Sequence, residues 1–112
     1  MKYIVLALIS FSLAACFSSK VATDTVSEPT LNLDKAKAKF PGYSTAMFDS
    51  GKKLYDSNCQ SCHALKDPLK FTEEQWTKLV PSMSAKANKN KGANLSKEDE
   101  DLIFKYLVSV GL

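Results

Sequence analysis

The chain is poor in the residues that build several common kinds of site. Its 112 residues include a single histidine, three cysteines, four glycines and four prolines. Arginine is missing altogether, so lysine supplies all 15 basic side chains. One histidine excludes ligation by two histidines of the same chain and leaves no second imidazole for acid–base work. The formal charge of +3 is too small and too dispersed to indicate nucleic-acid binding.

Half-buried β-strands are not indicated either, because no segment alternates apolar and polar residues. Apolar residues recur instead at three- and four-residue steps, as on one face of a helix. Three such stripes follow one another along the chain: Met47, Phe48, Gly51, Leu54 and Tyr55; Trp76, Leu79, Val80 and Met83; and Leu102, Ile103, Tyr106, Leu107 and Val110. The pattern predicts an all-α domain of about three helices over residues 40–112.

Several residues mark where these helices begin and end. Thr72 stands three residues before Gln75, as in a capping box, and Ser96 precedes an acidic first turn. We therefore expect one helix to begin after each of these hydroxyl residues. Pro81 has no backbone N–H, so it is expected to kink or end the middle helix. Gly111 lies where the last helix can stop.

The most specific motif is Cys59-Gln60-Ser61-Cys62-His63, an unaltered C-x-x-C-H. This spacing is the attachment signature of c-type haem. Each cysteine can form a thioether to one vinyl group of the porphyrin, and one turn of helix would place both sulfurs along that edge. His63 then directs an imidazole nitrogen at the iron. The motif predicts one covalently bound haem c, held by Cys59, Cys62 and His63.

Three other interpretations of this motif stay open. A redox-active disulfide of the thioredoxin kind belongs to a βαβ setting, and no strand-like segment precedes Cys59. A structural zinc site takes four ligands. After the three residues of the motif, the chain offers no further Cys or His outside the N-terminal leader. The third interpretation is chance occurrence of the pattern.

Residues 1–15 have the layout of an export signal. A lysine near the start is followed by an apolar run over residues 3–13 and by small residues. The run is too short to span a bilayer comfortably. Leu13-Ala14-Ala15-Cys16 resembles a bacterial lipobox, which implies cleavage before Cys16 and lipidation of its thiol. The alternatives are an ordinary cleaved signal with a chance cysteine and an uncleaved membrane helix. More than one acyl chain on Cys16 would anchor the protein firmly to a membrane.

Residues 16–39 differ in character from both their neighbours. Beyond Cys16, most of this stretch is small or polar, and Pro29 interrupts it. It has too few large apolar residues to build a core, so it is predicted to be a flexible tether. A loop that wraps the domain is the alternative. The chain is thus divided into a signal peptide, a lipidated tether and a folded domain over residues 40–112.

Two methionines follow the leader, Met47 and Met83. Met47 lies on the helix that leads into Cys59, so we expect it in the core. Met83 follows His63 in the chain, close to the break expected at Pro81. It is the candidate for the second iron ligand, because a thioether is a soft ligand that stabilises ferrous iron, and His/Met ligation raises the reduction potential. Core packing is the alternative for Met83, and a lysine ligand or an open sixth position is the alternative for the iron.

Over residues 43–110 the chain resembles the small monohaem class I cytochromes c. The match includes the C-x-x-C-H motif and, around it, Gly51, Tyr55, Ala64, Leu65, Pro68, Phe71, Thr72, Trp76, Met83, Leu95, Ser96, Tyr106 and Leu107. The resemblance implies that the first and last helices cross, with Gly51 close to Tyr106. It also implies that the Pro68 region supplies a backbone carbonyl to the second ring nitrogen of His63. The interval from His63 to Met83 is shorter than in mitochondrial-type members, so one side of the haem is expected to be more exposed.

Together these features predict an exported, lipid-anchored c-type cytochrome facing the periplasm or the cell exterior. It would transfer single electrons between membrane-bound redox proteins, without substrate turnover of its own. We expect a monomer or a subunit of a respiratory complex, and no nucleic-acid partner. The alternatives are a haem-based sensor or gas-binding module, which needs a labile sixth position, and a haem subunit of a larger oxidoreductase.

A basic run over residues 86–92 contains three lysines. It is most simply a solvated loop. The alternative is a docking patch near the haem edge that steers an acidic partner in a salt-dependent way.

Overall fold

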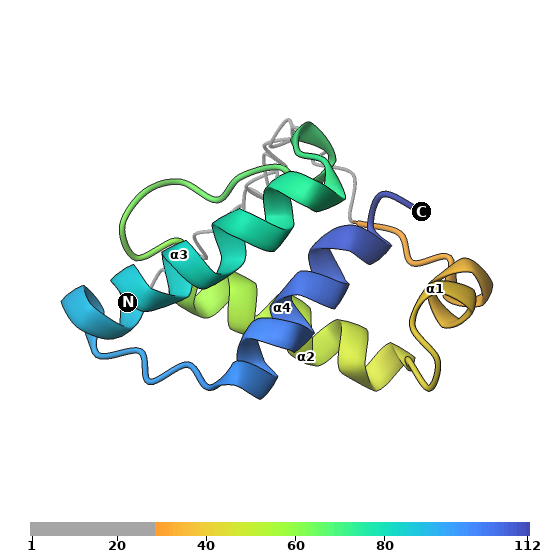
Figure 1. Cartoon of the computed structure of the whole chain (residues 1–112), viewed down its shortest axis with the longest axis horizontal. Helices are drawn as coiled ribbons and strands as arrows, with labels where there is room; N and C mark the ends of the chain where they lie inside the picture. Colours follow the sequence, from red (N-terminus) through yellow and green to blue (C-terminus); the bar gives the residue numbers. More distant parts are fainter. Residues whose placement is uncertain (1–28) are drawn as a thin grey trace, which may run out of the picture.

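The structure, a computed structural model, describes residues 29–112, and these form an all-helical domain (Figure 1). The elements are α1 (Leu33–Lys39), α2 (Thr45–Cys59), a short 3₁₀-helix η1 (Pro68–Lys70), α3 (Glu73–Lys91) and α4 (Lys97–Ser109). No strand occurs in this part of the chain, which confirms the all-α prediction. Helices α2, α3 and α4 lie within the predicted range of residues 40–112, and α1 adds a fourth helix in the stretch predicted to be a tether. The predicted signal peptide and Cys16 lie outside the described residues.

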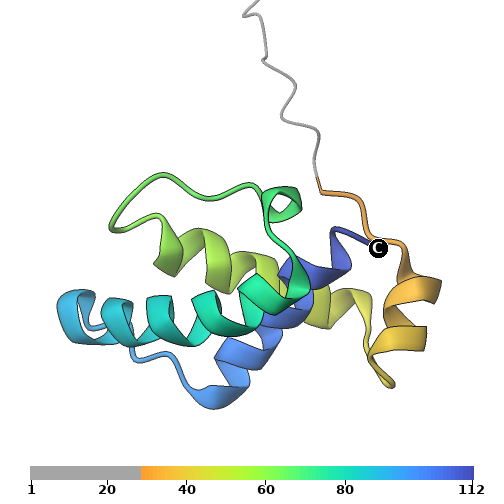
Figure 2. The same ribbon diagram turned by 45° about the horizontal axis from the view of Figure 1, so that its top comes forward.

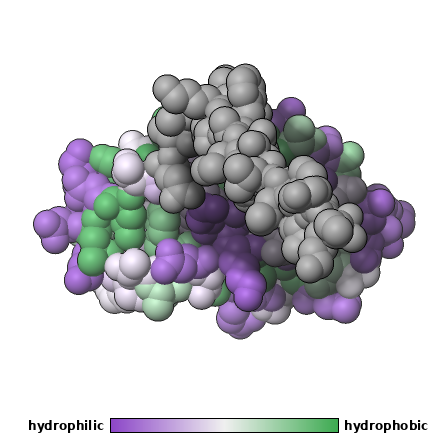
Figure 3. Space-filling model, turned by 180° about the vertical axis from the view of Figure 1, so that it is seen from behind, coloured by the Kyte–Doolittle hydropathy of each residue, from purple (hydrophilic) through white to green (hydrophobic). Residues whose placement is uncertain are grey.

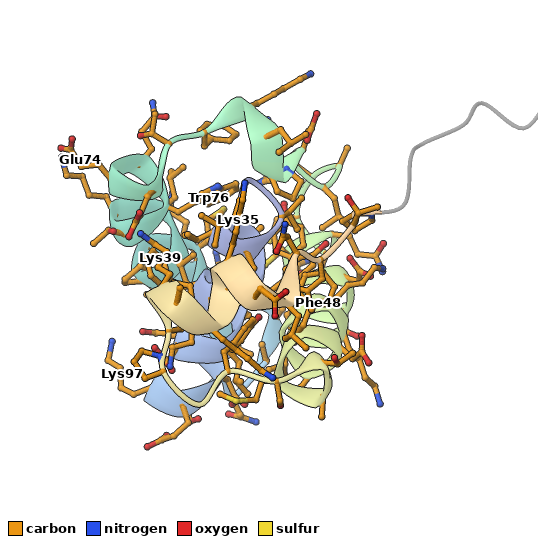
Figure 4. All side chains as sticks on the ribbon, turned by 90° about the vertical axis from the view of Figure 1, so that its right-hand side faces the viewer. Lys35, Lys39, Phe48, Glu74, Trp76 and Lys97 are labelled. Atoms are coloured by element: carbon orange, nitrogen blue, oxygen red, sulfur yellow. The ribbon has the colours of Figure 1, made fainter. Side chains whose placement is uncertain are left out.

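Helix α1 belongs to the folded domain. The Asn32 side chain caps it by accepting a hydrogen bond from the Lys35 backbone N–H. Ala36 is fully buried in the hydrophobic core. The Lys35 ammonium also donates to the backbone oxygen of Leu112 at 2.7 Å, so α1 joins the end of the chain. In Figure 4, which looks onto α1, Lys35 and Lys39 extend from this helix. The sequence predicts a tether over residues 33–39 because short Ala/Lys segments give no core signal.

Helices α2 and α4 form the most extensive helix contact, as the resemblance implied. Gly51 permits it, because a Cβ atom there would stand 2.8 Å from the Cβ of Tyr106 and would clash with the Leu102 backbone. The ring centroids of Phe48 and Tyr106 are 5.1 Å apart in an edge-on arrangement. Such aromatic pairs stabilise a contact by about 0.5–1.5 kcal/mol beyond the area that they bury.

Helix α3 begins as the sequence predicts and ends later. Thr72 and Gln75 form the reciprocal capping box. The expected end at Pro81 is wrong, because the helix continues to Lys91 and stops at Gly92, whose φ is +64°. Pro81 lies on the exposed side of α3, where the Thr77 carbonyl that lacks its N–H partner can be solvated. The inner face of α3 buries Trp76 and packs on α4, and this contact outweighs the local cost of the proline.

Helix α4 is the centre of the domain. Ser96 and Asp99 form a second capping box at its start. Ile103, Tyr106 and Leu107 are buried, as the apolar stripe predicted. Helix α4 packs against both α2 and α3, which contact each other much less (Figures 1 and 2). The ends of α2 and α3 are therefore positioned chiefly through α4.

Among the helices of residues 29–112, none combines the length and the apolar character that crossing a membrane requires.

The Gly51 crossing yields a stability prediction. Gly51→Ala should lower the free energy of unfolding by about 1–3 kcal/mol, because the new methyl group forces α2 away from α4. Urea unfolding followed by circular dichroism measures this. Gly111→Ala is the matched control, because its Cβ would meet nothing closer than the Val108 oxygen at 3.6 Å. It should change stability by no more than about 0.5 kcal/mol. Equal losses in the two variants would contradict the role given to Gly51.

Candidate functional site

The C-x-x-C-H motif lies where α2 ends and an exposed loop begins. Cys59 is the last residue of α2, and the next three residues form a turn. The two thiols are therefore separated by a tight turn, and not by the turn of helix that the sequence predicted. The Ser61 hydroxyl closes it by donating to the Asn58 carbonyl at 2.8 Å. Figure 2 shows the chain leaving α2 and arching over to η1.

The two cysteine thiols are free and differ in environment. Cys59 is half-buried, whereas Cys62 is exposed. Burial, followed by the nearby Asp56 carboxylate and Cys62, raises the pKa of the Cys59 thiol to about 11. The reactive cysteine of a dithiol oxidoreductase has a lowered pKa instead. The electrostatics of Cys59 thus differ from those of a disulfide-exchange site.

His63 is exposed, and one of its two ring nitrogens has a protein partner. Its Nδ1 lies 2.7 Å from the backbone oxygen of Ala64. A carbonyl oxygen only accepts hydrogen bonds, so Nδ1 carries the proton in the neutral ring. The lone pair is then on Nε2, which is the nitrogen left to bind a metal. This arrangement fits a ligating histidine, which usually donates its other N–H to a carbonyl or carboxylate.

The carbonyl expected to hold His63 has another partner in the structure. The Pro68 oxygen accepts a hydrogen bond from the indole Nε1 of Trp76 at 3.1 Å. The implied bond from the Pro68 region to His63 is not observed, because the Nδ1 of His63 lies against the Ala64 oxygen instead. The indole reaches Pro68 because Trp76 is buried in the first turns of α3, directly after η1.

A second tie to this loop comes from α2 and was missed by the sequence reasoning. The Tyr55 hydroxyl donates to the Lys66 carbonyl at 2.7 Å and accepts from the Lys66 N–H at 3.0 Å. In the sequence, the one sign of this bond is that Tyr55 carries a hydroxyl on a stripe of otherwise apolar residues. Tyr55 and Trp76 also contact each other edge-on, with ring centroids 6.4 Å apart. Two buried aromatic residues thus hold the segment that follows His63.

Two large apolar side chains are exposed within residues 29–112, and both come after the motif in the sequence. Leu65 is 38% exposed and Leu69 is 65% exposed. Every residue from 60 to 67 is exposed as well. Figure 3 shows that apolar side chains also reach the surface on the far face of the domain, between hydrophilic ones. Leu65 therefore places one accessible apolar side chain close to the C-x-x-C-H motif, among polar neighbours such as His63 and Lys66.

Met83 is placed on α3, apart from the loop that carries the motif. It lies one turn from Val80 and is half-buried against the hydrophobic core. Met47, on α2, is half-buried against the same core. Burial by itself therefore does not distinguish the two thioethers, and the case for Met83 still depends on its place in the chain.

No group of three or more His, Cys, Asp or Glu side chains in residues 29–112 is arranged to hold a metal ion. A structural zinc site would need four such ligands around one point. A c-type haem makes a smaller demand, because its two thiols bond to the porphyrin and only the imidazole of the motif reaches the iron.

Comparison of the chain with models of protein families, with curated proteins and with solved structures finds no match. The functional interpretation therefore depends on the chemistry of the motif and on the geometry around it.

The unequal thiols yield a labelling prediction for protein produced without haem. At pH 8, iodoacetamide should modify Cys62 faster than Cys59, because only the thiolate reacts and Cys59 remains protonated until the pH approaches about 11. Peptide mass spectrometry separates the two sites. Labelling of Cys59 should rise as the pH is raised from 8 to 10. Faster labelling of Cys59 at pH 8 would contradict the burial described for it.

Proposed function

We propose that the protein is a membrane-anchored c-type cytochrome that transfers single electrons between extracytoplasmic redox partners. The observation that carries the proposal is the C-x-x-C-H motif at the end of α2, with two free thiols and a histidine whose Nε2 is available. A haem iron supplies the redox chemistry, because it alternates between ferrous and ferric states. No side chain of the chain itself needs to change its bonds for that purpose.

The residues around the motif fit a covalently attached haem. Cys59 and Cys62 would hold the porphyrin rim through thioethers, and His63 would bind the iron through Nε2. The Ala64 oxygen holds the opposite ring nitrogen at 2.7 Å and so orients the imidazole. Leu65, two residues after His63, offers apolar surface close to this group. Burial of that surface against a porphyrin would contribute to stability, at about 25 cal/mol per Å².

The helix arrangement supports the likeness to a small class I cytochrome c. In both, the helix that ends in the haem motif crosses the last helix. Here the crossing is made possible by Gly51, which lies against Leu102 and Tyr106. The crossing alone does not identify a cytochrome, but it combines with a motif that such proteins need.

Met83 is the proposed second iron ligand. Its flexible thioether is half-buried on α3, the helix that follows the motif-bearing loop. A sulfur ligand raises the reduction potential of a haem, as expected of an electron carrier. A haem-based sensor would differ at this point, because it requires an open or labile sixth position.

The surface also offers a candidate docking region for a redox partner. Lys86, Lys89 and Lys91 lie in the last turns of α3, rather than in the loop that the sequence suggested. None of them takes part in an ion pair within residues 29–112. Such lysines can accelerate association with an acidic partner, and the effect falls as salt is added. In this proposal Cys16 carries the lipid anchor, so that both partners are reached at a membrane.

The ligand assignment is tested with Met83→Ala and the matched variant Met47→Ala. Loss of Met83 should abolish the sulfur-to-iron charge-transfer band of the ferric protein and lower the reduction potential. Loss of Met47 should leave both unchanged, because it removes a comparable half-buried thioether from α2. Optical spectra and redox titration measure the outcome. If the wild type shows no such band and Met83→Ala leaves the spectrum and the potential unaltered, an open-site sensor becomes the better interpretation.

The cofactor and the anchor are tested by the intact mass of protein extracted from its native membranes. The mass should show loss of residues 1–15, acyl groups on Cys16 and one haem. Replacing Cys59 and Cys62 together by alanine should remove the covalent haem and keep the acyl groups. A mature mass without haem would refute the central proposal. Co-purification of other subunits after detergent extraction would favour the haem subunit of a larger complex.

A further inference from the structure

The hydroxyl of Tyr55 binds both polar groups of one backbone residue. It donates to the Lys66 oxygen at 2.7 Å and accepts from the Lys66 nitrogen at 3.0 Å. Tyr55 itself is 2% exposed, and its ring packs against Trp76 and Tyr106. The donor and acceptor of Lys66 are thus satisfied by a side chain fixed in the core, as a neighbouring strand would satisfy them.

We propose that Tyr55 is a positioning residue for His63. Its hydroxyl fixes the course of the chain three residues after the imidazole, and so fixes the direction in which Nε2 points. The inference rests on the proposed function, because it assigns His63 to the iron. It names a residue outside the C-x-x-C-H motif on which the geometry of the iron ligand depends.

The loop has few other restraints in this region. All residues from 60 to 67 are exposed, so packing contributes little to its course. The Ser61 hydroxyl bonds to Asn58 within the first turn, and the Nδ1 of His63 contacts its own neighbour Ala64. The first bond reaches only the last turn of α2, ahead of His63, and the second stays within the loop. Lys66 is the first residue after His63 that is tied to a different part of the domain.

The tie does not depend on pH over the range in which proteins are stable. Burial raises the pKa of Tyr55 to about 12, although the hydrogen bond to Lys66 opposes this effect. The phenol therefore keeps its proton at neutral pH and remains a donor to the Lys66 carbonyl. A phenylalanine would fill the same space in the core and leave the Lys66 N–H and C=O without this partner.

Tyr43 provides a closely matched control. It is 1% exposed, and its hydroxyl makes no hydrogen bond of good geometry, although the Ser109 side chain on α4 lies near it. Tyr55→Phe and Tyr43→Phe therefore remove the same single atom from equally buried rings. Only the first removes two hydrogen bonds to the loop.

The experiment uses the full-length protein with its haem and compares these two variants with the wild type. In Tyr55→Phe, the Lys66 amide should exchange with deuterium at least ten-fold faster, because its partner is lost. The electron paramagnetic resonance signal of the ferric iron should broaden, because the imidazole of His63 takes more than one orientation. Tyr43→Phe should match the wild type in both measurements.

Each outcome decides a separate point. Unchanged Lys66 exchange in Tyr55→Phe would overturn the inference, as would faster exchange with an unaltered resonance signal, which indicates a structural role alone. If the purified chain holds no haem, the proposed function fails, and Lys66 exchange still tests the tie to Tyr55. If Tyr55→Phe does not fold, nuclear magnetic resonance of the wild type decides. The Tyr55 hydroxyl proton must then exchange slowly, and rapid exchange refutes the inference.

Discussion

The close approach of α2 to α4 at Gly51 is the contact on which the rest of the domain depends. A side chain at this position would meet the Leu102 backbone and Tyr106, so only glycine lets the two helices touch. The rings of Phe48 and Tyr55 then pack against Tyr106 on either side of the contact. Because α2 ends in Cys59, the crossing also decides where the C-x-x-C-H motif leaves the core.

Two aromatic side chains with polar tips connect the core at that crossing to the loop after the motif. Tyr55 belongs to α2 and Trp76 to α3, and the two rings contact each other in the core. The hydroxyl of Tyr55 binds Lys66, and the indole N–H of Trp76 binds the Pro68 carbonyl. Burial of its apolar part fixes each ring in the core. Its polar tip then restrains a segment that has little packing of its own. These hydrogen bonds restrict the exposed loop to one backbone conformation.

Surface charges contribute less to this architecture. Four of the five ion pairs in residues 29–112 join lysines to carboxylates three or four residues away in the same helix. Exposed pairs of this kind stabilise a protein by about 0–1 kcal/mol each. The pair between Lys39 and Glu73 is different, because it joins α1 to α3. Together with the bond from Lys35 to Leu112, it fastens the first helix to the domain.

Local sequence determined the all-α class, the starts of α3 and α4 at their capping boxes, and the inward faces of α2 and α4. It also identified the motif, because C-x-x-C-H is defined by spacing alone. These features depend on residues within one or two helical turns, which sequence patterns record directly. The packing of α1, the passage of α3 through Pro81 and the partners of Pro68 and Lys66 depend on residues distant in the chain. Only the tertiary structure decided them, because burial and hydrogen bonding between separate elements outweigh local preference there.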